Sequence, residues 1–135
     1  MTGDRYTLRR AAHPACLADL HELVARAGVE HPEVSPTDFM LLEVAVIEVA
    51  GNVVKHARGT ASVTFAFELR VLPDALDVRI EDDGTEFTGE LAAQMPDEYD
   101  ESGRGLPIAR ELLHEFTYER DGALNRWRLL RALCG

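Results

Sequence analysis

The long apolar segment at residues 36–57 constrains the fold of this chain most strongly. Apolar side chains recur along it at the spacing of a helix, and in its first half they cover most of the helix circumference. Ser35 can cap this helix, Pro36 suits its first turn, and Asp38 places a negative charge near its N-terminus. We therefore expect a long central helix that other elements bury on most sides.

The flanking segments carry the patterns of strands and of amphipathic helices. Two runs, 63–71 and 76–80, alternate apolar and polar residues around a short turn, which predicts an antiparallel hairpin with one face on a core. The other expected elements are a strand at 6–11, helices at 14–28 and 103–116, and a closing hairpin of strands at 117–120 and 125–133. We expect an α/β fold in a single domain at 1–135: a two-layer sandwich of a mixed, mostly antiparallel sheet with three helices on one face.

Composition and charge exclude several classes of protein. The 135 residues carry a formal net charge of −10 and show no basic patch, which argues against binding nucleic acid or an anionic membrane. A phosphate ligand is still compatible, since a metal ion and backbone N–H groups can neutralise it locally. No apolar run approaches the ~20 residues of a membrane span and no signal peptide opens the chain, so the expected location is the cytoplasm. The two cysteines and five histidines show no metal-ligand spacing.

The second half of the 36–57 helix carries polar residues on a face that is apolar one to two turns earlier. Glu48 and Asn52 are four residues apart and share this face, and Lys55 and His56 follow on it. One interpretation is that the helix end emerges into solvent. The other is that it forms the floor of a site, where a glutamate could act as a general base and an amide oxygen could bind Mg²⁺.

Asp82 lies two residues beyond the last core-facing position of the 76–80 strand, so the same period should point it inward. A carboxylate at such a position is costly to bury without a partner. Either the strand has ended there and the carboxylate turns to water, helped by Gly84, or Asp82 is a buried acceptor for a donor such as an exocyclic amine.

A glycine-rich stretch of Gly103, Arg104, Gly105 and Leu106 opens the third expected helix. Free N–H groups at a helix N-terminus favour an anion, and Arg104 would add a cation. By itself the pattern is also that of an ordinary glycine-rich loop. The preceding segment, 84–102, is long for a loop in a compact domain, and it contains acidic residues but no Lys or Arg. A phosphate ligand would therefore need a metal ion all the more.

These three motifs, in this order and spacing, resemble the GHKL ATPase superfamily, which includes histidine kinases and certain bacterial protein serine kinases. The resemblance covers residues 35–133 and implies the Bergerat ATP-binding fold. Within the superfamily, the single-domain length, the short loop between the motifs and the ending at 106–130 are most similar to the anti-sigma factor serine-protein kinases of bacterial partner-switching systems.

The resemblance implies a role for each matching residue. The glutamate of the first motif is the catalytic base in that family and the asparagine holds Mg²⁺, which implies these roles for Glu48 and Asn52. The adenine amine would bind Asp82, with Gly84 giving room for the ring. The remaining expected contacts are the flanking Lys55 and His56 and the phosphate-cradling backbone of Gly103, Arg104, Gly105 and Leu106.

The family also implies cofactors and partners: ATP with Mg²⁺, an anti-sigma-factor antagonist as the serine substrate, a sigma factor or other regulator, and a homodimer. Two departures concern activity. Glu86 replaces the second glycine of the D-x-G-x-G motif, and Glu101 stands where these kinases often place a basic residue. One alternative is a nucleotide-responsive protein-binding regulator with little kinase activity. Another is the catalytic portion of a histidine kinase, which we rank lower because we see no preceding helical hairpin with a phosphoacceptor histidine.

Overall fold

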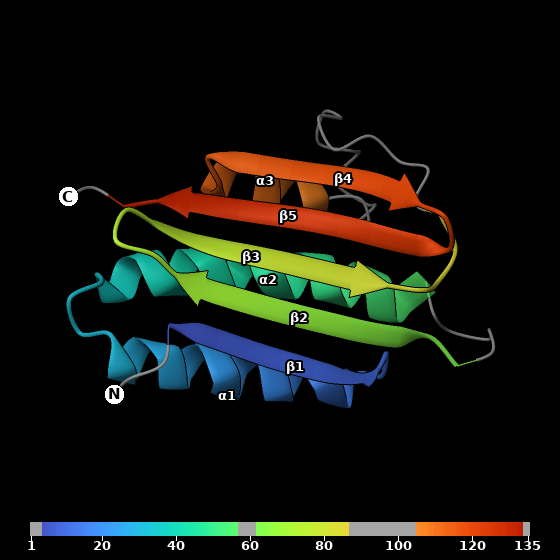
Figure 1. Ribbon diagram of the computed structural model, residues 1–135, viewed down its shortest axis with the longest axis horizontal. Coiled ribbons are helices and arrows are strands. Elements are labelled where there is room, and N and C mark those ends of the chain that lie inside the picture. Colours follow the sequence, from blue (N-terminus) through green and yellow to red (C-terminus); the bar gives the residue numbers. More distant parts are fainter. Residues whose placement is uncertain (1–3, 57–61, 87–104, 134–135) are drawn as a thin grey trace.

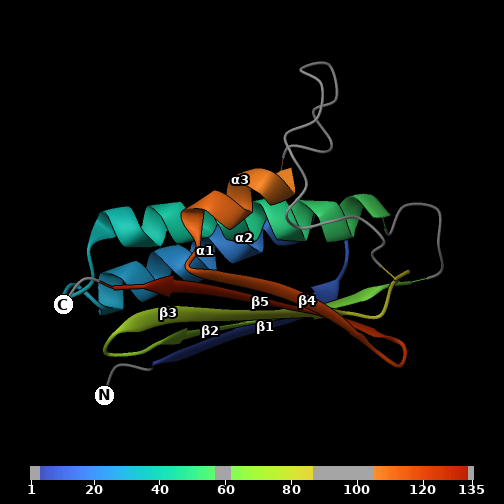
Figure 2. The same cartoon turned by 90° about the horizontal axis from the view of Figure 1, so that it is seen from above.

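The computed structural model of the chain describes residues 4–56, 62–86 and 105–133, and this part forms two layers (Figure 1). One layer is a five-stranded sheet, and the helices pack together on one of its faces (Figure 2). The elements in chain order are β1 (Arg5–Ala11), α1 (Ala15–Glu30), α2 (Pro36–His56), β2 (Thr64–Val71), β3 (Ala75–Asp82), α3 (Gly105–Leu112), β4 (Glu115–Asp121) and β5 (Leu124–Ala132). This order and these layers confirm the predicted α/β sandwich.

The sheet is antiparallel throughout, with the strand order β1-β2-β3-β5-β4. Two of its pairs are hairpins between consecutive strands, β2–β3 and β4–β5. The second hairpin turns at Gly122, whose φ of +60° is a conformation that glycine adopts without steric cost. Because β3 pairs with β5, the last residue of β3, Asp82, lies opposite Asn125 on one side and Phe65 on the other. This register brings together residues that are 43 positions apart.

The core lies between the two layers. Alternate residues of each strand point toward the helices, as a pleated strand with one covered face requires. On β2 and β3 these inward residues are Phe65, Phe67, Leu69, Val71, Leu76, Val78 and Ile80, and all are buried. They pack against fully buried α2 residues such as Leu42, Val46 and Val49. Each such side chain stabilises the fold by about 1.5–3 kcal/mol.

The central helix α2 is less buried than the sequence predicts. Met40 is 57% exposed and Val44 is 39% exposed, although both lie in its apolar first half. The helices α1 and α3 flank α2 within a single layer, so the side of α2 that faces away from the sheet stays open (Figure 2). The prediction of burial on most sides is therefore wrong for these two residues. None of the described helices is long and apolar enough to cross a membrane.

Two helix ends also differ from the prediction. The first helix continues through Gly28 to Glu30, and Gly28 packs beside Phe39, where a Cβ would lie 3.7 Å from the ring. The third helix ends at Leu112 and does not include Phe116. Phe116 belongs to β4, where it is buried and stacks on Trp127 with ring centroids 6.1 Å apart. Its apolar character fits the period of a strand as well as that of a helix.

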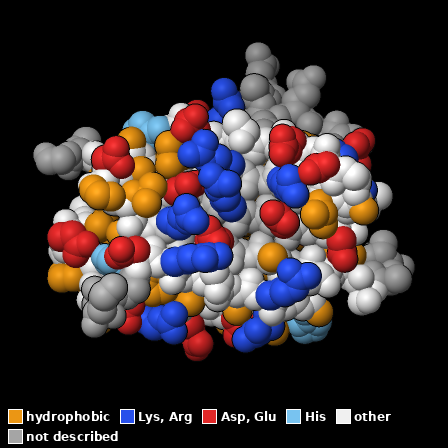
Figure 3. All heavy atoms as spheres, viewed as in Figure 1, with side chains coloured by type: hydrophobic (Ala, Val, Ile, Leu, Met, Phe, Trp, Pro, Cys, Tyr) orange, Lys and Arg blue, Asp and Glu red, His pale blue; other side chains and the backbone are white. Residues whose placement is uncertain are grey.

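The opposite face of the sheet carries many charged side chains (Figure 3). Several of them pair across strands, such as Arg5 with Glu68 and Arg126 with Glu81. Asp77 on β3 is only 5% exposed and lies between two arginines. Its carboxylate oxygens are 3.4 Å from Arg128 Nε and 3.9 Å from Arg79 Nη2. These arginines are directly opposite each other in the β3–β5 register, so Asp77 offsets the repulsion between like charges.

Candidate functional site

The described parts of the predicted motifs lie toward one end of the molecule. Figures 1 and 2 show that α2 and β3 both end there, and that α3 begins above the second half of α2. The polar residues of α2, the carboxylate of Asp82 and the start of α3 are therefore carried by neighbouring elements. The two layers hold them from different sides, with α2 and α3 above and β3 below.

The polar face of α2 holds side chains that have no partner in the described part of the chain. Glu48 and Asn52 are half-buried and Lys55 is exposed. No hydrogen bond or ion pair joins any of these three side chains to another described residue. The half-buried carboxylate and amide therefore keep their oxygens available for a ligand. His56 is the last residue of α2, and its side chain lies outside the described part.

Asp82 is 5% exposed at the end of β3, so its carboxylate points inward and not to water. One oxygen, Oδ1, accepts two hydrogen bonds, from the Gly84 N–H and from Asn125 Nδ2, each at 2.9 Å. The other oxygen, Oδ2, accepts none from the residues that the structure describes. A buried carboxylate with one anchored oxygen and one oxygen left over is suited to accept a hydrogen bond from a ligand.

Gly84 lies close to this carboxylate. A Cβ at its position would be 3.0 Å from Asp82 Oδ1, which is tighter than ordinary van der Waals contact. The absence of a side chain thus lets the backbone N–H of Gly84 reach Asp82. Glu86, which replaces the second glycine of the motif, is exposed.

Three residues that the sequence analysis did not identify hold Asp82 and the loop after it. Asn125 is 2% exposed, and its Nδ2 also donates to the Thr85 carbonyl at 2.8 Å. Tyr118 OH and Arg120 Nη1 both donate to Asn125 Oδ1. The sequence did carry a sign of Asn125. It is two residues before Trp127 in β5, so the alternation of the strand points it toward the core, where a polar side chain needs a partner.

The third motif is only partly described. Gly103 and Arg104 lie outside the described residues, and α3 begins at Gly105. The side chain of Leu106 also lies outside the described part. The expectation that Gly103, Arg104, Gly105 and Leu106 cradle phosphates therefore stays a prediction.

The residues present fit a nucleotide with a divalent cation. Asp82 Oδ2 is an acceptor for an amino group, and the Asn52 amide oxygen is a hard oxygen ligand of the kind that Mg²⁺ prefers. The Glu48 carboxylate can serve as a general base. Within the described ranges, no three His, Cys, Asp or Glu side chains gather as a metal-binding set. Mg²⁺ usually takes few protein oxygens and completes its coordination with phosphates and water, which suits a single amide ligand such as Asn52.

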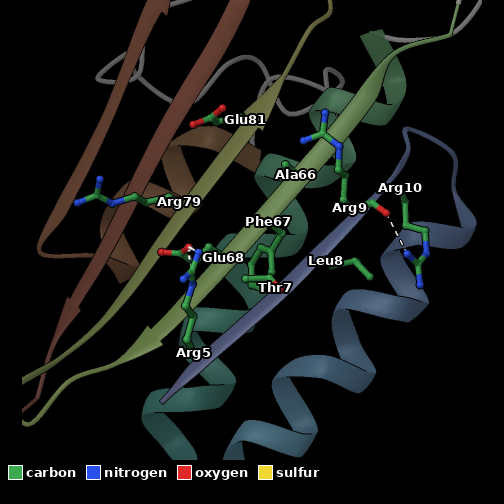
Figure 4. Close-up of a pocket in the computed structure, with 10 residues that line it drawn as sticks. All are labelled: Arg5, Thr7, Leu8, Arg9, Arg10, Ala66, Phe67, Glu68, Arg79 and Glu81. Carbon is green, nitrogen blue, oxygen red and sulfur yellow. Dashed lines mark hydrogen bonds and ion pairs between the residues drawn. The ribbon is translucent and has the colours of Figure 1, made fainter. Parts of the chain in front are cut away.

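A hollow on the outer face of the sheet is separate from this site (Figure 4). It lies over β1, β2 and β3, and Arg5, Arg9, Glu68 and Arg79 line it. Arg5 Nη2 is 2.8 Å from Glu68 Oε2, so part of this charge is already paired. The candidate site is on the other face, because Asp82 points toward the helices.

Comparison with known proteins agrees with this geometry. Residues 10–130 match the family model described as a histidine kinase-like ATPase domain. The chain is also 31% identical over 102 residues to the serine-protein kinase RsbW of Listeria monocytogenes serovar 1/2a. This match covers 72% of the chain and 62% of the relative, so the chain spans less than two thirds of that protein's length. With its two-layer fold and its buried Asp82, the chain belongs to the histidine kinase-like ATPase domain family.

Proposed function

We propose that this protein is an ATP-dependent protein serine kinase and anti-sigma factor that phosphorylates an anti-sigma-factor antagonist in the cytoplasm of a bacterium. The observation that carries the proposal is the anchored carboxylate of Asp82, on a strand of the sheet that packs against α2, in a histidine kinase-like ATPase domain. On α2, the half-buried side chains of Glu48 and Asn52 make no hydrogen bond or ion pair with another described residue. Similarity to a protein named as a serine-protein kinase supports serine as the acceptor.

In this proposal Asp82 recognises the base and α2 serves the phosphates. Asp82 Oδ2 accepts a hydrogen bond from the exocyclic amine of adenine, and Gly84 leaves room for the ring. Asn52 provides an oxygen ligand for Mg²⁺. Bound Mg²⁺ neutralises phosphate charge, which matters in a chain with a net charge of −10. The other expected contacts are Lys55, His56 and the backbone of Gly103, Arg104, Gly105 and Leu106.

The transfer step needs a base for the serine hydroxyl. Glu48 takes the hydroxyl proton while the serine oxygen forms a bond to the γ-phosphorus of ATP. The bond between the γ-phosphorus and the oxygen that bridges it to the β-phosphate breaks, and ADP leaves. Glu48 suits this task because it is half-buried and engages no described side chain.

Partner exchange would follow from the phosphorylation state of the antagonist. The dephosphorylated antagonist occupies the kinase and frees the sigma factor. Phosphorylation adds negative charge to the antagonist at the surface of an acidic protein, which weakens their contact. The kinase then becomes available to the sigma factor again.

The proposal is tested by mixing the purified protein with a candidate antagonist, ATP and Mg²⁺ and measuring the antagonist by mass spectrometry. We expect a gain of one phosphate on a serine, and a loss of this gain in the Glu48→Ala variant. Glu43→Ala is the matched control, since Glu43 is on the same helix but pairs with His21 at 2.8 Å. Transfer that continues unchanged in Glu48→Ala would contradict the role of this residue.

A second candidate function is a nucleotide-responsive regulator that binds its partner without phosphorylating it. The exposed Glu86 at the end of the Asp82 motif favours it, because glutamate replaces a glycine there. Calorimetry with ATP and ADP beside the transfer assay separates the two functions. Nucleotide-dependent partner binding without a mass gain would favour the regulator.

A further inference from the structure

We propose that Asn125 is a positioning residue of the nucleotide site, which holds the Asp82 carboxylate so that Oδ2 is the acceptor for the base. The inference rests on the proposed nucleotide site and names the residue on which its base recognition depends. Asn125 lies on β5, directly opposite Asp82 on β3, and is 2% exposed.

The Asn125 side chain uses its full hydrogen-bonding capacity. Its amide nitrogen donates to Asp82 Oδ1 at 2.9 Å and to the Thr85 carbonyl at 2.8 Å, with the Gly84 carbonyl at 3.3 Å. Its amide oxygen accepts from Tyr118 OH and from Arg120 Nη1. An amide has two donor hydrogens and two acceptor lone pairs, so each is accounted for.

This arrangement fixes which way the amide faces. In the flipped orientation, Asn125 Oδ1 would meet the Asp82 carboxylate and the Thr85 carbonyl, which are all acceptors. The amide nitrogen would meet the Arg120 guanidinium, which only donates. Such contacts leave buried polar groups unsatisfied, which proteins avoid. Arg120, which only donates, and the Asp82 and Thr85 oxygens, which only accept, therefore select the orientation in which Asn125 donates to Asp82.

As a result, the two carboxylate oxygens of Asp82 have different roles. Oδ1 is occupied by Asn125 and by the Gly84 N–H, which hold the carboxylate in place. Oδ2 stays an acceptor and selects a base that presents an amino group. Arg120 Nη1 also donates to the Gly84 carbonyl at 2.8 Å, so the loop after β3 is tied to the β4–β5 hairpin.

A first test needs no nucleotide. The sequence has two asparagines and one glutamine, so the side-chain amide region of an NMR spectrum holds three pairs of signals. We expect the Asn125 amide protons to exchange with solvent about tenfold or more slowly than those of Asn52, since a buried hydrogen bond must open first. Exchange at the rate of Asn52 would show that the Asn125 hydrogen bonds do not hold Asp82 in place, whether or not the protein binds ATP.

The second test is the pH dependence of ATP affinity in Asn125→Asp. The new carboxyl can donate to Asp82 Oδ1 only while it holds a proton. As the pH rises and the proton leaves, two carboxylates repel each other beside the base. We expect the ratio of variant to wild-type dissociation constants to rise about tenfold or more between pH 5.5 and 8, the equivalent of one lost hydrogen bond. Taking the ratio cancels the titration of the nucleotide itself.

The outcomes separate the inference from the proposed function. A ratio near one at every pH, with ATP bound by the wild type, would overturn the positioning role of Asn125. No ATP binding by the wild type would overturn the proposed function. Amide exchange would still show whether the Asn125 hydrogen bonds hold Asp82 in place. If Asn125→Asp does not fold, Tyr118→Phe replaces it, because it removes the hydroxyl that donates to the Asn125 amide oxygen. We expect it to weaken ATP binding about fivefold, and unchanged binding would count against the inference.

Discussion

Replacing Asp82 with asparagine separates its structural role from its role toward a ligand. In the free protein, an asparagine oxygen in place of Asp82 Oδ1 can still accept from the Gly84 N–H and from Asn125 Nδ2. The amide nitrogen then occupies the place of Oδ2. A donor replaces an acceptor at the position that would meet the adenine amine.

The effects of Asp82→Asn on stability and on nucleotide affinity differ in size. Each retained hydrogen bond loses its charge assistance, so we expect the free energy of unfolding to fall by about 1–2 kcal/mol. Nucleotide binding loses a charge-assisted hydrogen bond and gains a contact between two donors. This amounts to about 3 kcal/mol, or about a hundredfold in the dissociation constant.

Calorimetric titration with ATP and Mg²⁺ measures the loss of nucleotide affinity, and urea unfolding measures the loss of stability. Asp83→Asn is the matched control, because it removes the same charge from the next residue. Asp83 is exposed, and its Oδ1 accepts the Thr64 N–H at 2.7 Å. We expect Asp83→Asn to bind ATP like the wild type. Equal ATP affinity in Asp82→Asn, Asp83→Asn and the wild type would refute the assignment of Asp82 to the base.

Three further predictions concern stability without nucleotide. Asp77→Ala leaves two opposed arginines without their carboxylate, so the free energy of unfolding should fall by about 1–2 kcal/mol in urea unfolding. The loss is smaller than for a fully buried pair, because the arginines reach water. Glu81→Ala, a half-exposed control on the same face, should change it by less than about 0.5 kcal/mol. Gly51→Ala should raise stability by about 0.5–1 kcal/mol, because a Cβ at this helical position meets nothing within 4 Å, and a loss of stability would contradict this. Burial and the hydrogen bond to Glu30 raise the pKa of Tyr6 to about 12 from its ordinary value of 10.0. A raised pKa adds stability that is complete below pH 10 and lost as the pH rises toward 12, so Tyr6→Phe should lack this alkaline loss in denaturation curves.

Much of the fold follows from periodicity along the chain. The alternation at 63–71 and 76–80 predicts β2 and β3, because each strand has one face on the core and one in water. The same reasoning points Asp82 inward. Periodicity fails where a short apolar run suits two structures, as at Phe116, which joins β4 and not α3. It also fails at Met40, since burial depends on how many helices share a layer.

The candidate site is predictable only in part, for a physical reason. Glu48 and Asn52 share a face through local helix geometry, which a sequence reveals directly. The partner of Asp82 depends on strand register between β3 and β5, which are joined through a long connection. The inward period marks Asn125 as a polar residue at a core position, but does not reveal that Asp82 lies opposite. The orientation of its amide further depends on Arg120 in a third strand, β4.

In the proposed function, α2 and β3 together form a single Mg²⁺-dependent ATP site. Calorimetric titration with ATP, with and without Mg²⁺, tests it most directly when applied to the wild type, Asn52→Ala and Asp82→Asn. We predict one ATP per chain, with an affinity that falls when Mg²⁺ is removed. Asn52→Ala should lose most of this dependence on Mg²⁺, whereas Asp82→Asn should bind weakly but keep it. Absence of ATP binding by the wild type, or an equal effect of Mg²⁺ in all three proteins, would contradict a joint site on α2 and β3.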